Sequence, residues 1–171
     1  MNQSKPSAPQ LLAAHHRLEE FDCAEPQLNT WLKQHAMKNH EAGASRTFVV
    51  CRENRILAYY CLAMGAVSLS IAPGKVRRNM PDPIPVAVIG RLAVDRKLEG
   101  QGYGKGLVKD AVLRVIQVSE VIGVRAILVH AISERAGDFY LRRGFLASPV
   151  EPLTLMLPMK DAVKTYAAAG S

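Results

Sequence analysis

The sequence has few cysteines, and none of them lies in a pattern typical of a metal site. The three present, Cys23, Cys51 and Cys61, are an odd number without C-x-x-C spacing. No nearby pair of histidines completes a zinc site. We therefore expect three reduced thiols with a structural role, and we expect no bound metal ion.

Long hydrophobic runs are also scarce. Near the N-terminus the apolar run covers only residues 11–14, which is too short for the core of a secretory signal. Residues 56–74 carry no charge, but apolar residues alternate with serines over 67–71 and a Pro-Gly pair follows. Because such alternation is typical of a strand, we expect a long buried strand here rather than a membrane span. The cytoplasm is then the expected compartment.

Acidic residues are in the minority. There are 15 Asp and Glu against 22 Lys and Arg, which gives a net charge of +7 at pH 7 and a sequence pI near 9.5. Between Ile71 and Lys109 eight basic residues accompany only three acidic ones. A basic region of this kind favours an anionic partner.

The length of 171 residues fits one domain spanning residues 1–171. The hydrophobic pattern predicts the order β, α, β-β, β, α, β, α, β, which is typical of a mixed α/β domain. The expected elements of the first half are a weak strand at 11–21, a helix from Pro26 to about Met37, and a hairpin turning at Glu53 and Asn54. A proline-rich loop at 73–85 and a strand at 86–95 follow. The second half is expected to contain a helix from Gly104 to Gly123, a strand at 124–130, a helix capped by Ser133, a last strand at 153–159, and a tail from about residue 160 that is helical or frayed.

The run EGQGYGKG at residues 99–106 places four glycines at alternate positions between a strand and a helix. It is no dinucleotide fingerprint, because the two registers of G-x-G-x-x-G place Lys105 or Leu107 at the third glycine. It is no Walker loop either, because Glu99 and Gly106 stand where glycine and Ser or Thr are required. Two interpretations remain: backbone amides that bind a phosphate at a helix N-terminus, or a tight turn without a ligand.

The surrounding segments favour the first interpretation. LAVDRKLEGQGYGKGL at 92–107 and AILVHAISERAGDFYLRRGF at 126–145 resemble the two core motifs of the GCN5-related N-acetyltransferases (GNAT). The resemblance implies a central, mostly antiparallel sheet flanked by helices, and acetyl-CoA as co-substrate without a metal. The residues it assigns to acetyl-CoA are Leu92, Ala93 and Val94 in a strand that pairs with the pantetheine arm, Gly100, Gln101, Gly102, Tyr103 and Gly104 in the pyrophosphate loop, Lys105, and Ser133.

Two positions depart from the family pattern. Glu99 stands where Arg or Gln usually opens the loop, and Ser133 stands where Asn usually starts the last helix. A carboxylate facing a pyrophosphate would be repelled, so we expect Glu99 to point outward and Lys105 to supply positive charge. Ser133 can still cap its helix and donate a hydrogen bond.

A closer resemblance covers nearly the whole chain. The segments at 21–51, 77–95, 122–131 and 139–145 are similar to the TacT-like GNAT toxins of bacterial toxin-antitoxin modules. This resemblance implies a toxin that acetylates the α-amine of the amino acid on charged tRNA and so blocks translation. It further implies neutralisation by a ribbon-helix-helix antitoxin and a homodimer.

Acetyl transfer to an amine requires a neutral nucleophile and a proton for the departing thiolate. With a pKa of about 10.4, only about one lysine in a thousand is neutral near pH 7.4, whereas roughly a quarter of α-amines are. An α-amine therefore needs no strong general base. Tyr140 stands where the family places the tyrosine that protonates the CoA sulfur, although by its spacing alone it is equally consistent with an aromatic on an amphipathic helix. Backbone N–H groups at 92–94 would polarise the carbonyl, and His130 is expected to be structural.

The basic residues divide between two anions. The phosphates of CoA can account for Lys105 and for Arg96 or Lys97, but not for the charges of the separate proline-rich loop. We therefore assign to tRNA phosphates the set Lys33, Lys38, Lys75, Arg77, Arg78 and Arg91. Because aromatic residues are only 6% of the chain, we expect recognition of shape and backbone rather than stacked bases.

Two other functions remain open from the sequence. The chain could be a GNAT enzyme that acetylates a small-molecule or protein amine, or a catalytically inactive GNAT module that binds nucleic acid or an antitoxin. Tyr140 and the intact glycine loop favour an enzyme.

Overall fold

The computed structural model describes residues 4–167, which contain a seven-stranded sheet in the order β1-β2-β3-β4-β5-β7-β6. The strands are β1 (Gln10–Leu11), β2 (Arg46–Arg52), β3 (Arg55–Val67), β4 (Ile84–Val94), β5 (Ala126–His130), β6 (Leu146–Ala147) and β7 (Thr154–Pro158). The helices are α1 (Pro26–Trp31), α2 (Met37–Ala42), α3 (Gly74–Arg77), α4 (Tyr103–Ser119), α5 (Glu134–Leu141) and α6 (Met159–Ala162), with π-helical turns at Leu32–Ala36 and Val163–Ala167 and a 3₁₀ turn at Arg96–Leu98. The predicted mixed α/β class with a mostly antiparallel sheet is confirmed.

The chain divides into two compact units. The first contains residues up to Ala63 together with Gly90–Asp110, and the second contains Met64–Ile89 and the residues from Ala111 onward.

The first unit begins with antiparallel strands. β1 pairs with β2, and β2 pairs with β3. The turn of the β2-β3 hairpin consists of Glu53 and Asn54, whose φ angles are +52° and +67°. Two consecutive left-handed residues are typical of the type I′ turn that matches the twist of a two-residue hairpin. The predicted hairpin is therefore confirmed.

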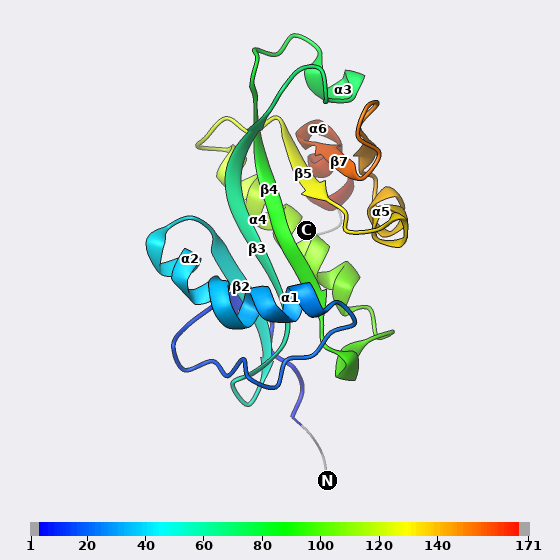
Figure 1. Ribbon diagram of the computed structural model, residues 1–171. Coiled ribbons are helices and arrows are strands. Elements are labelled where there is room, and N and C mark those ends of the chain that lie inside the picture. The colour runs from blue at the N-terminus through cyan, green and yellow to red at the C-terminus, as the bar shows by residue number, and fades with distance from the viewer. Residues whose placement is uncertain (1–3, 168–171) are drawn as a thin grey trace. The chain divides into compact units, whose positions relative to one another are not determined.

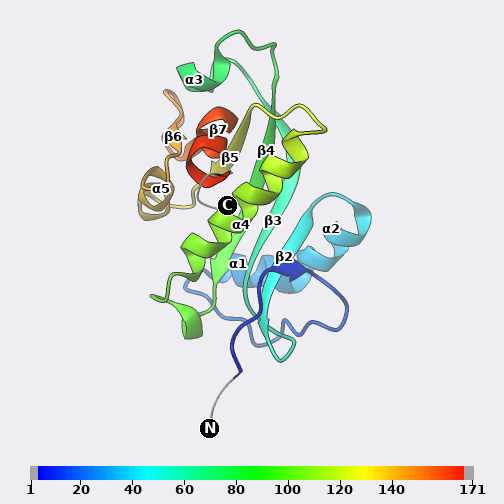
Figure 2. The same ribbon diagram turned by 180° about the vertical axis from the view of Figure 1, so that it is seen from behind.

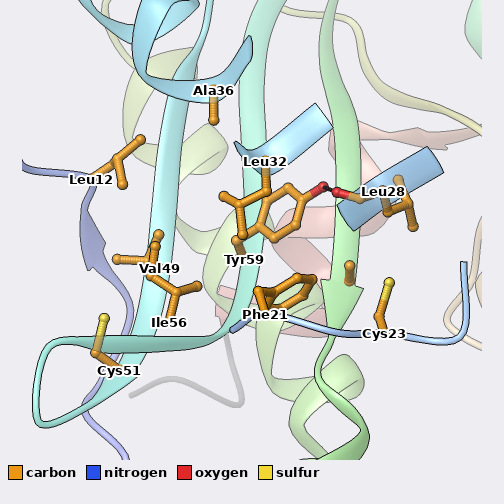
Figure 3. Close-up of a cluster of buried hydrophobic side chains, with 11 residues drawn as sticks. Leu12, Phe21, Cys23, Leu28, Leu32, Ala36, Val49, Cys51, Ile56 and Tyr59 are labelled. Atoms are coloured by element: carbon orange, nitrogen blue, oxygen red, sulfur yellow. Dashed lines mark hydrogen bonds between the residues drawn. The ribbon is translucent and has the colours of Figure 1, made fainter. Parts of the chain in front are cut away.

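Neighbouring tyrosines of β3 show how the first unit is layered. The hydroxyl of Tyr59 donates to the backbone carbonyl of Leu28 in α1 at 2.7 Å, and Figure 3 shows this ring among the buried side chains beneath α1. The next residue points to the opposite face, where the Tyr60 hydroxyl donates to the Asp110 carboxylate in α4. Figure 1 accordingly shows α1 and α2 in front of β2 and β3, and Figure 2 shows the first turns of α4 on the other side.

The first helical segment is longer than expected. It starts at Pro26 as predicted, but it continues through the π-helical turn and α2 and ends at Gly43, which has φ +79°. Leu28, Leu32 and Ala36 are its buried residues. The residues after Met37 carry no apolar repeat, so only the left-handed glycine marks the true end.

In the second unit β4 and β5 run parallel, with Val86 opposite Ala126, and β7 pairs antiparallel with both β5 and β6. Val86 and Ala126 belong to a buried cluster with Ile84, Leu128 and Met156. A parallel pair requires a crossover connection, which here contains α4.

Four further sequence-based expectations are corrected. The alternation at 67–71 is not strand, because β3 ends at Val67 and a turn follows. The N-terminal strand covers only Gln10–Leu11. The helix expected to reach Gly123 ends at Ser119. The proline-rich loop contains the short helix α3, whose entry follows Pro73.

The C-terminal tail is helical through Ala167, in α6 and the π-helical turn that follows it. The last part of the tail expected to be helical or frayed, residues 168–171, lies outside the described residues. Within residues 4–167, no helix combines the length and the apolar character needed to cross a membrane.

Candidate active site

The glycine loop joins β4 to α4 in the first unit. Gly100 and Gly102 have φ angles of +74° and +85°, a left-handed conformation that glycine adopts without strain. The first hydrogen bond of the helix runs from the Gly106 amide to the Gly102 carbonyl at 3.1 Å. The amides between them have no partner within the helix and carry the positive end of its dipole.

The backbone of this loop is open at three of its glycines. A Cβ atom added at Gly100, Gly102 or Gly106 would meet no heavy atom within 4 Å. Lys105 is exposed in the first turn of α4, where an ammonium group adds to the attraction for an anion. The predicted cofactor loop is thus compatible with a bound pyrophosphate.

The remaining predicted loop residues adjoin these amides in the chain. Glu99 and Gln101 are both exposed, and the Gln101 amide donates to the Lys97 carbonyl at 3.2 Å. Tyr103 and Gly104 are half-buried at the start of α4. The exposure of Glu99 agrees with an outward side chain, while its orientation toward a bound pyrophosphate stays a prediction.

The predicted pantetheine strand is the last part of β4. Leu92 and Val94 are half-buried, whereas Ala93 is buried in the cluster beneath α1. Ala93 therefore faces α1, and its two neighbours point to the other face of the strand. Their backbone groups directly precede the 3₁₀ turn and the glycine loop.

Ser133 and Tyr140 lie in the second unit, on one helix. The Ser133 hydroxyl accepts a hydrogen bond from the Ala136 amide at 3.1 Å, so its predicted capping of α5 is confirmed. Its proton is still available for donation to a ligand. The predicted role of Ser133 in cofactor binding stays a prediction.

Tyr140 lies near the end of α5 and is only 7% exposed. Its ring contacts Phe139 and Phe145 edge to face, with centroid distances of 5.1 and 5.3 Å. Burial raises the pKa of this phenol well above its ordinary value, and Arg143 opposes the shift. The phenol therefore keeps its proton at neutral pH, as a proton donor must and a general base cannot.

His130 ends β5, where its Nδ1 lies 3.1 Å from Thr154 Oγ1. The side chain is exposed, and this hydrogen bond agrees with the structural role expected for it. The three cysteines are free and buried. Burial raises the pKa of the Cys51 and Cys61 thiols to about 11, so both are unreactive at neutral pH.

Of the basic residues predicted to contact tRNA, three lie in the first unit. Lys33 and Lys38 are exposed on the π-helical turn and α2. The Arg91 guanidinium lies 5.3 Å from the centroid of the Trp31 ring, and Trp31 in turn stacks on Tyr59 at 5.9 Å. This contact between Arg91 and Trp31, the only tryptophan of the chain, was not predicted from the sequence.

The other three predicted tRNA contacts surround α3 in the second unit. Arg77 and Arg78 are exposed, whereas Lys75 forms an ion pair of 3.1 Å with Asp161. Arg125 fixes this segment: its guanidinium donates to the carbonyls of Lys75, Val76 and Arg78 at 3.1, 2.9 and 3.2 Å. No local sequence signal predicts this role for Arg125.

Two comparisons place the chain in a family. Residues 11–145 match the model of the acetyltransferase (GNAT) family. A tRNA-acetylating toxin of Mycobacterium tuberculosis is 49% identical over 156 residues, which are 91% of this chain and 94% of that toxin. The chain therefore belongs to the GNAT acetyltransferase family.

Solved structures show which members of the GNAT family this chain resembles in fold and sequence. AtaT complexed with acetyl-methionyl-tRNAfMet is 30% identical with a TM-score of 0.86, covering 98% of this chain and 100% of that one. A tyrosine-to-phenylalanine variant of AtaT, bound to the C-terminus of the antitoxin AtaR and to acetyl-CoA, is 28% identical with a TM-score of 0.82, covering 96% and 99%. Within the GNAT family, the chain groups with the acetyltransferase toxins of toxin-antitoxin systems.

The left-handed backbone of the loop gives a direct prediction. Gly102→Ala should weaken acetyl-CoA binding about tenfold, because the left-handed conformation costs a residue with a Cβ roughly 1–2 kcal/mol. Gly106→Ala is the matched control: it has the same open surroundings without a left-handed φ, and alanine favours a helix. Calorimetric titration with CoA should separate the two variants. Equal affinities would show that the loop conformation does not limit binding.

Proposed function

We propose that the protein transfers the acetyl group of acetyl-CoA to the α-amine of the amino acid on charged tRNA, and thereby acts as a translation-blocking toxin. The observation that carries this proposal is the 49% identity with a tRNA-acetylating toxin across 91% of the chain. That match extends well beyond the cofactor motifs. AtaT, a structural relative at 30% identity, was solved with an acetylated aminoacyl-tRNA.

On the donor side, the residues bind and orient acetyl-CoA, which supplies an activated thioester. The amides of Gly102, Tyr103 and Gly104, together with Lys105, bind the pyrophosphate. Backbone groups of Leu92, Ala93 and Val94 pair with the pantetheine arm, and an N–H there polarises the acetyl carbonyl. Gly100 and Gln101 complete the loop, and Ser133 donates a hydrogen bond.

On the acceptor side, the α-amine enters neutral in a substantial fraction of molecules, so the protein needs no strong base. The amine nitrogen bonds to the acetyl carbon and loses a proton to solvent, and the bond from carbon to sulfur breaks. Tyr140 gives its proton to the departing sulfur and is reprotonated from water. We assign the tRNA phosphates to Lys33, Lys38, Lys75, Arg77, Arg78 and Arg91.

We also propose that residues 1–171 act as a single GNAT domain and that the protein is a homodimer in the cytoplasm, where charged tRNA is available. A ribbon-helix-helix antitoxin would neutralise it. Support comes from AtaT, which was solved with the C-terminus of its antitoxin AtaR. A short ribbon-helix-helix reading frame directly upstream of the gene would support this assignment.

The deciding experiment offers the purified protein acetyl-CoA with four acceptors: charged tRNA, the same tRNA without its amino acid, the free amino acid, and a peptide with a free N-terminus. We expect acetylation of the charged tRNA alone, detected by mass spectrometry of the aminoacyl-adenosine released by ribonuclease. Acetylation of the free amino acid or the peptide, with none on tRNA, would overturn the proposal in favour of a small-molecule or protein acetyltransferase.

A further inference from the structure

A buried carboxylate lies between the cofactor strand and the glycine loop. Asp95 follows the last residue of β4 and is 2% exposed. Its Oδ1 accepts a hydrogen bond from the Lys97 amide at 2.9 Å, and its Oδ2 accepts one from the Asp22 amide, also at 2.9 Å. Its own amide donates to the Leu57 carbonyl at 2.8 Å.

These two acceptor bonds join different parts of the first unit. Lys97 belongs to the 3₁₀ turn that leads into the glycine loop. Asp22 is 73 residues away from Asp95 in sequence and lies shortly before α1. A carboxylate presents two acceptor oxygens to donors from different directions, whereas an amide side chain presents one. Asp95 therefore attaches the entry to the loop and the entry to α1 at the same point.

Further bonds extend this attachment into the helix. The Arg96 amide donates to the Asp22 carbonyl at 3.0 Å, and the Arg96 guanidinium pairs with the Asp22 carboxylate at 3.2 Å. The Asn29 amide group of α1 donates to the same carboxylate at 3.1 Å, and its oxygen accepts from the Cys23 amide at 2.8 Å. The polar chain thus runs from the loop to the first turn of α1.

The same side of β4 carries two more contacts with α1. Arg91, Ala93 and Asp95 alternate along the strand and share one face. Arg91 stacks over Trp31 of α1, and Ala93 is packed in the buried cluster that contains Leu28 and Leu32. Of these three residues, Asp95 is the one whose side chain bonds both to Asp22, ahead of α1, and to Lys97 in the turn before the loop.

We propose that Asp95 is a positioning residue for acetyl transfer. It holds the glycine loop and the start of α1 as one piece, so that the donor loop keeps its place relative to the helical segment bearing Lys33 and Lys38. This inference rests on the proposed function, because it assigns the loop to acetyl-CoA and the helical segment to tRNA. Its effect is on the binding of both substrates and not on the chemical step, since Asp95 contacts no reacting atom.

The test is Asp95→Asn, in which one of the two backbone amides loses its acceptor. We expect the Kd for CoA and the KM for acetyl-CoA to rise about tenfold, the equivalent of one lost hydrogen bond to a charged group. The KM for charged tRNA should rise in the same direction, while kcat stays within about twofold of the original protein. The matched control is Glu20→Gln, whose carboxylate pairs with Arg55 at 2.9 Å outside this polar chain. That side chain is 68% exposed, and an exposed ion pair contributes little.

Simple destabilisation gives a different result. If Asp95 only stabilises the fold, Asp95→Asn lowers the melting temperature and the apparent kcat, but both KM values and the Kd for CoA are unchanged, and this outcome overturns the inference. KM does not depend on the amount of folded enzyme, so it remains measurable when part of the variant is unfolded. Failure of the proposed function is recognised separately, because the unsubstituted protein would then leave charged tRNA unmodified.

Discussion

Tyr140→Phe is expected to lower kcat for tRNA acetylation by about 10²–10⁴-fold, the usual contribution of a positioned acid. The affinity for acetyl-CoA should stay the same. The substitution removes one hydroxyl and keeps the ring that packs against Phe139 and Phe145, so the fold loses little. Single-turnover kinetics with charged tRNA, together with calorimetric titration of CoA, measure both quantities.

The pH dependence follows from the burial of the phenol. Because burial raises the pKa of Tyr140 above its ordinary value of about 10, the proton needed for donation is present at every pH below that value. The rate should therefore show no loss from Tyr140 as the pH rises from 7 to 9. Any decline in that range belongs to another group or to the substrate.

The control for this prediction is Tyr166→Phe in the same unit. Its hydroxyl donates to the Arg143 carbonyl at 3.2 Å, so the substitution removes the same atom from a tyrosine with no assigned role in the reaction. We expect kcat to stay within about twofold of the original protein, since a neutral hydrogen bond contributes only about 1 kcal/mol to stability. If Tyr140→Phe behaves like this control, the proton for the thiolate comes from elsewhere.

Expression of the active protein should also arrest growth, and Tyr140→Phe should relieve that arrest.

Local features of the fold were predictable because their signals are local. The turn at Glu53 and Asn54, the cap at Ser133 and the left-handed glycines at 100 and 102 each depend on a few adjacent residues. A serine before a helix can cap it, and a glycine between a strand and a helix permits a left-handed turn, whatever the rest of the chain does. The family motifs add the identity of the donor because they combine such local signals in a fixed order.

Contacts between residues that are distant in the sequence could not be predicted from local signals. Asp95 meets Asp22 across 73 residues, and Arg125 meets the carbonyls of α3 across 47 to 50. Neither partner stands at a spacing that periodicity can detect, because such bonds form only after the strands have paired. For the same reason Arg91 was predicted as a tRNA contact from its charge, while its contact with the Trp31 ring was not predicted.

The tRNA assignment is tested most strongly at α3, where Arg77 and Arg78 are exposed. Replacing both with Glu should lower tRNA acetylation by at least about 10²-fold near physiological salt, because two phosphate contacts become repulsive. The affinity for acetyl-CoA should be unaffected. In a milder variant, Arg77→Ala with Arg78→Ala, the slope of log affinity against log salt should fall by about two units, one for each phosphate contact.

Net charge and position must be separated in this experiment. Replacing both arginines with Glu lowers the net charge of the chain by four from +7, and such a change alone weakens binding to any polyanion. The variant Lys5→Glu with Arg52→Glu makes the same change at residues outside the predicted tRNA set, and at position 52 it places a carboxylate opposite Arg55 in the β2-β3 ladder. If both double variants lose tRNA acetylation equally, the effect is one of total charge. If the α3 variant retains full turnover on tRNA, the assignment of Arg77 and Arg78 is wrong. A selective loss in the α3 variant identifies this helix, fixed by Arg125, as a surface that binds the acceptor.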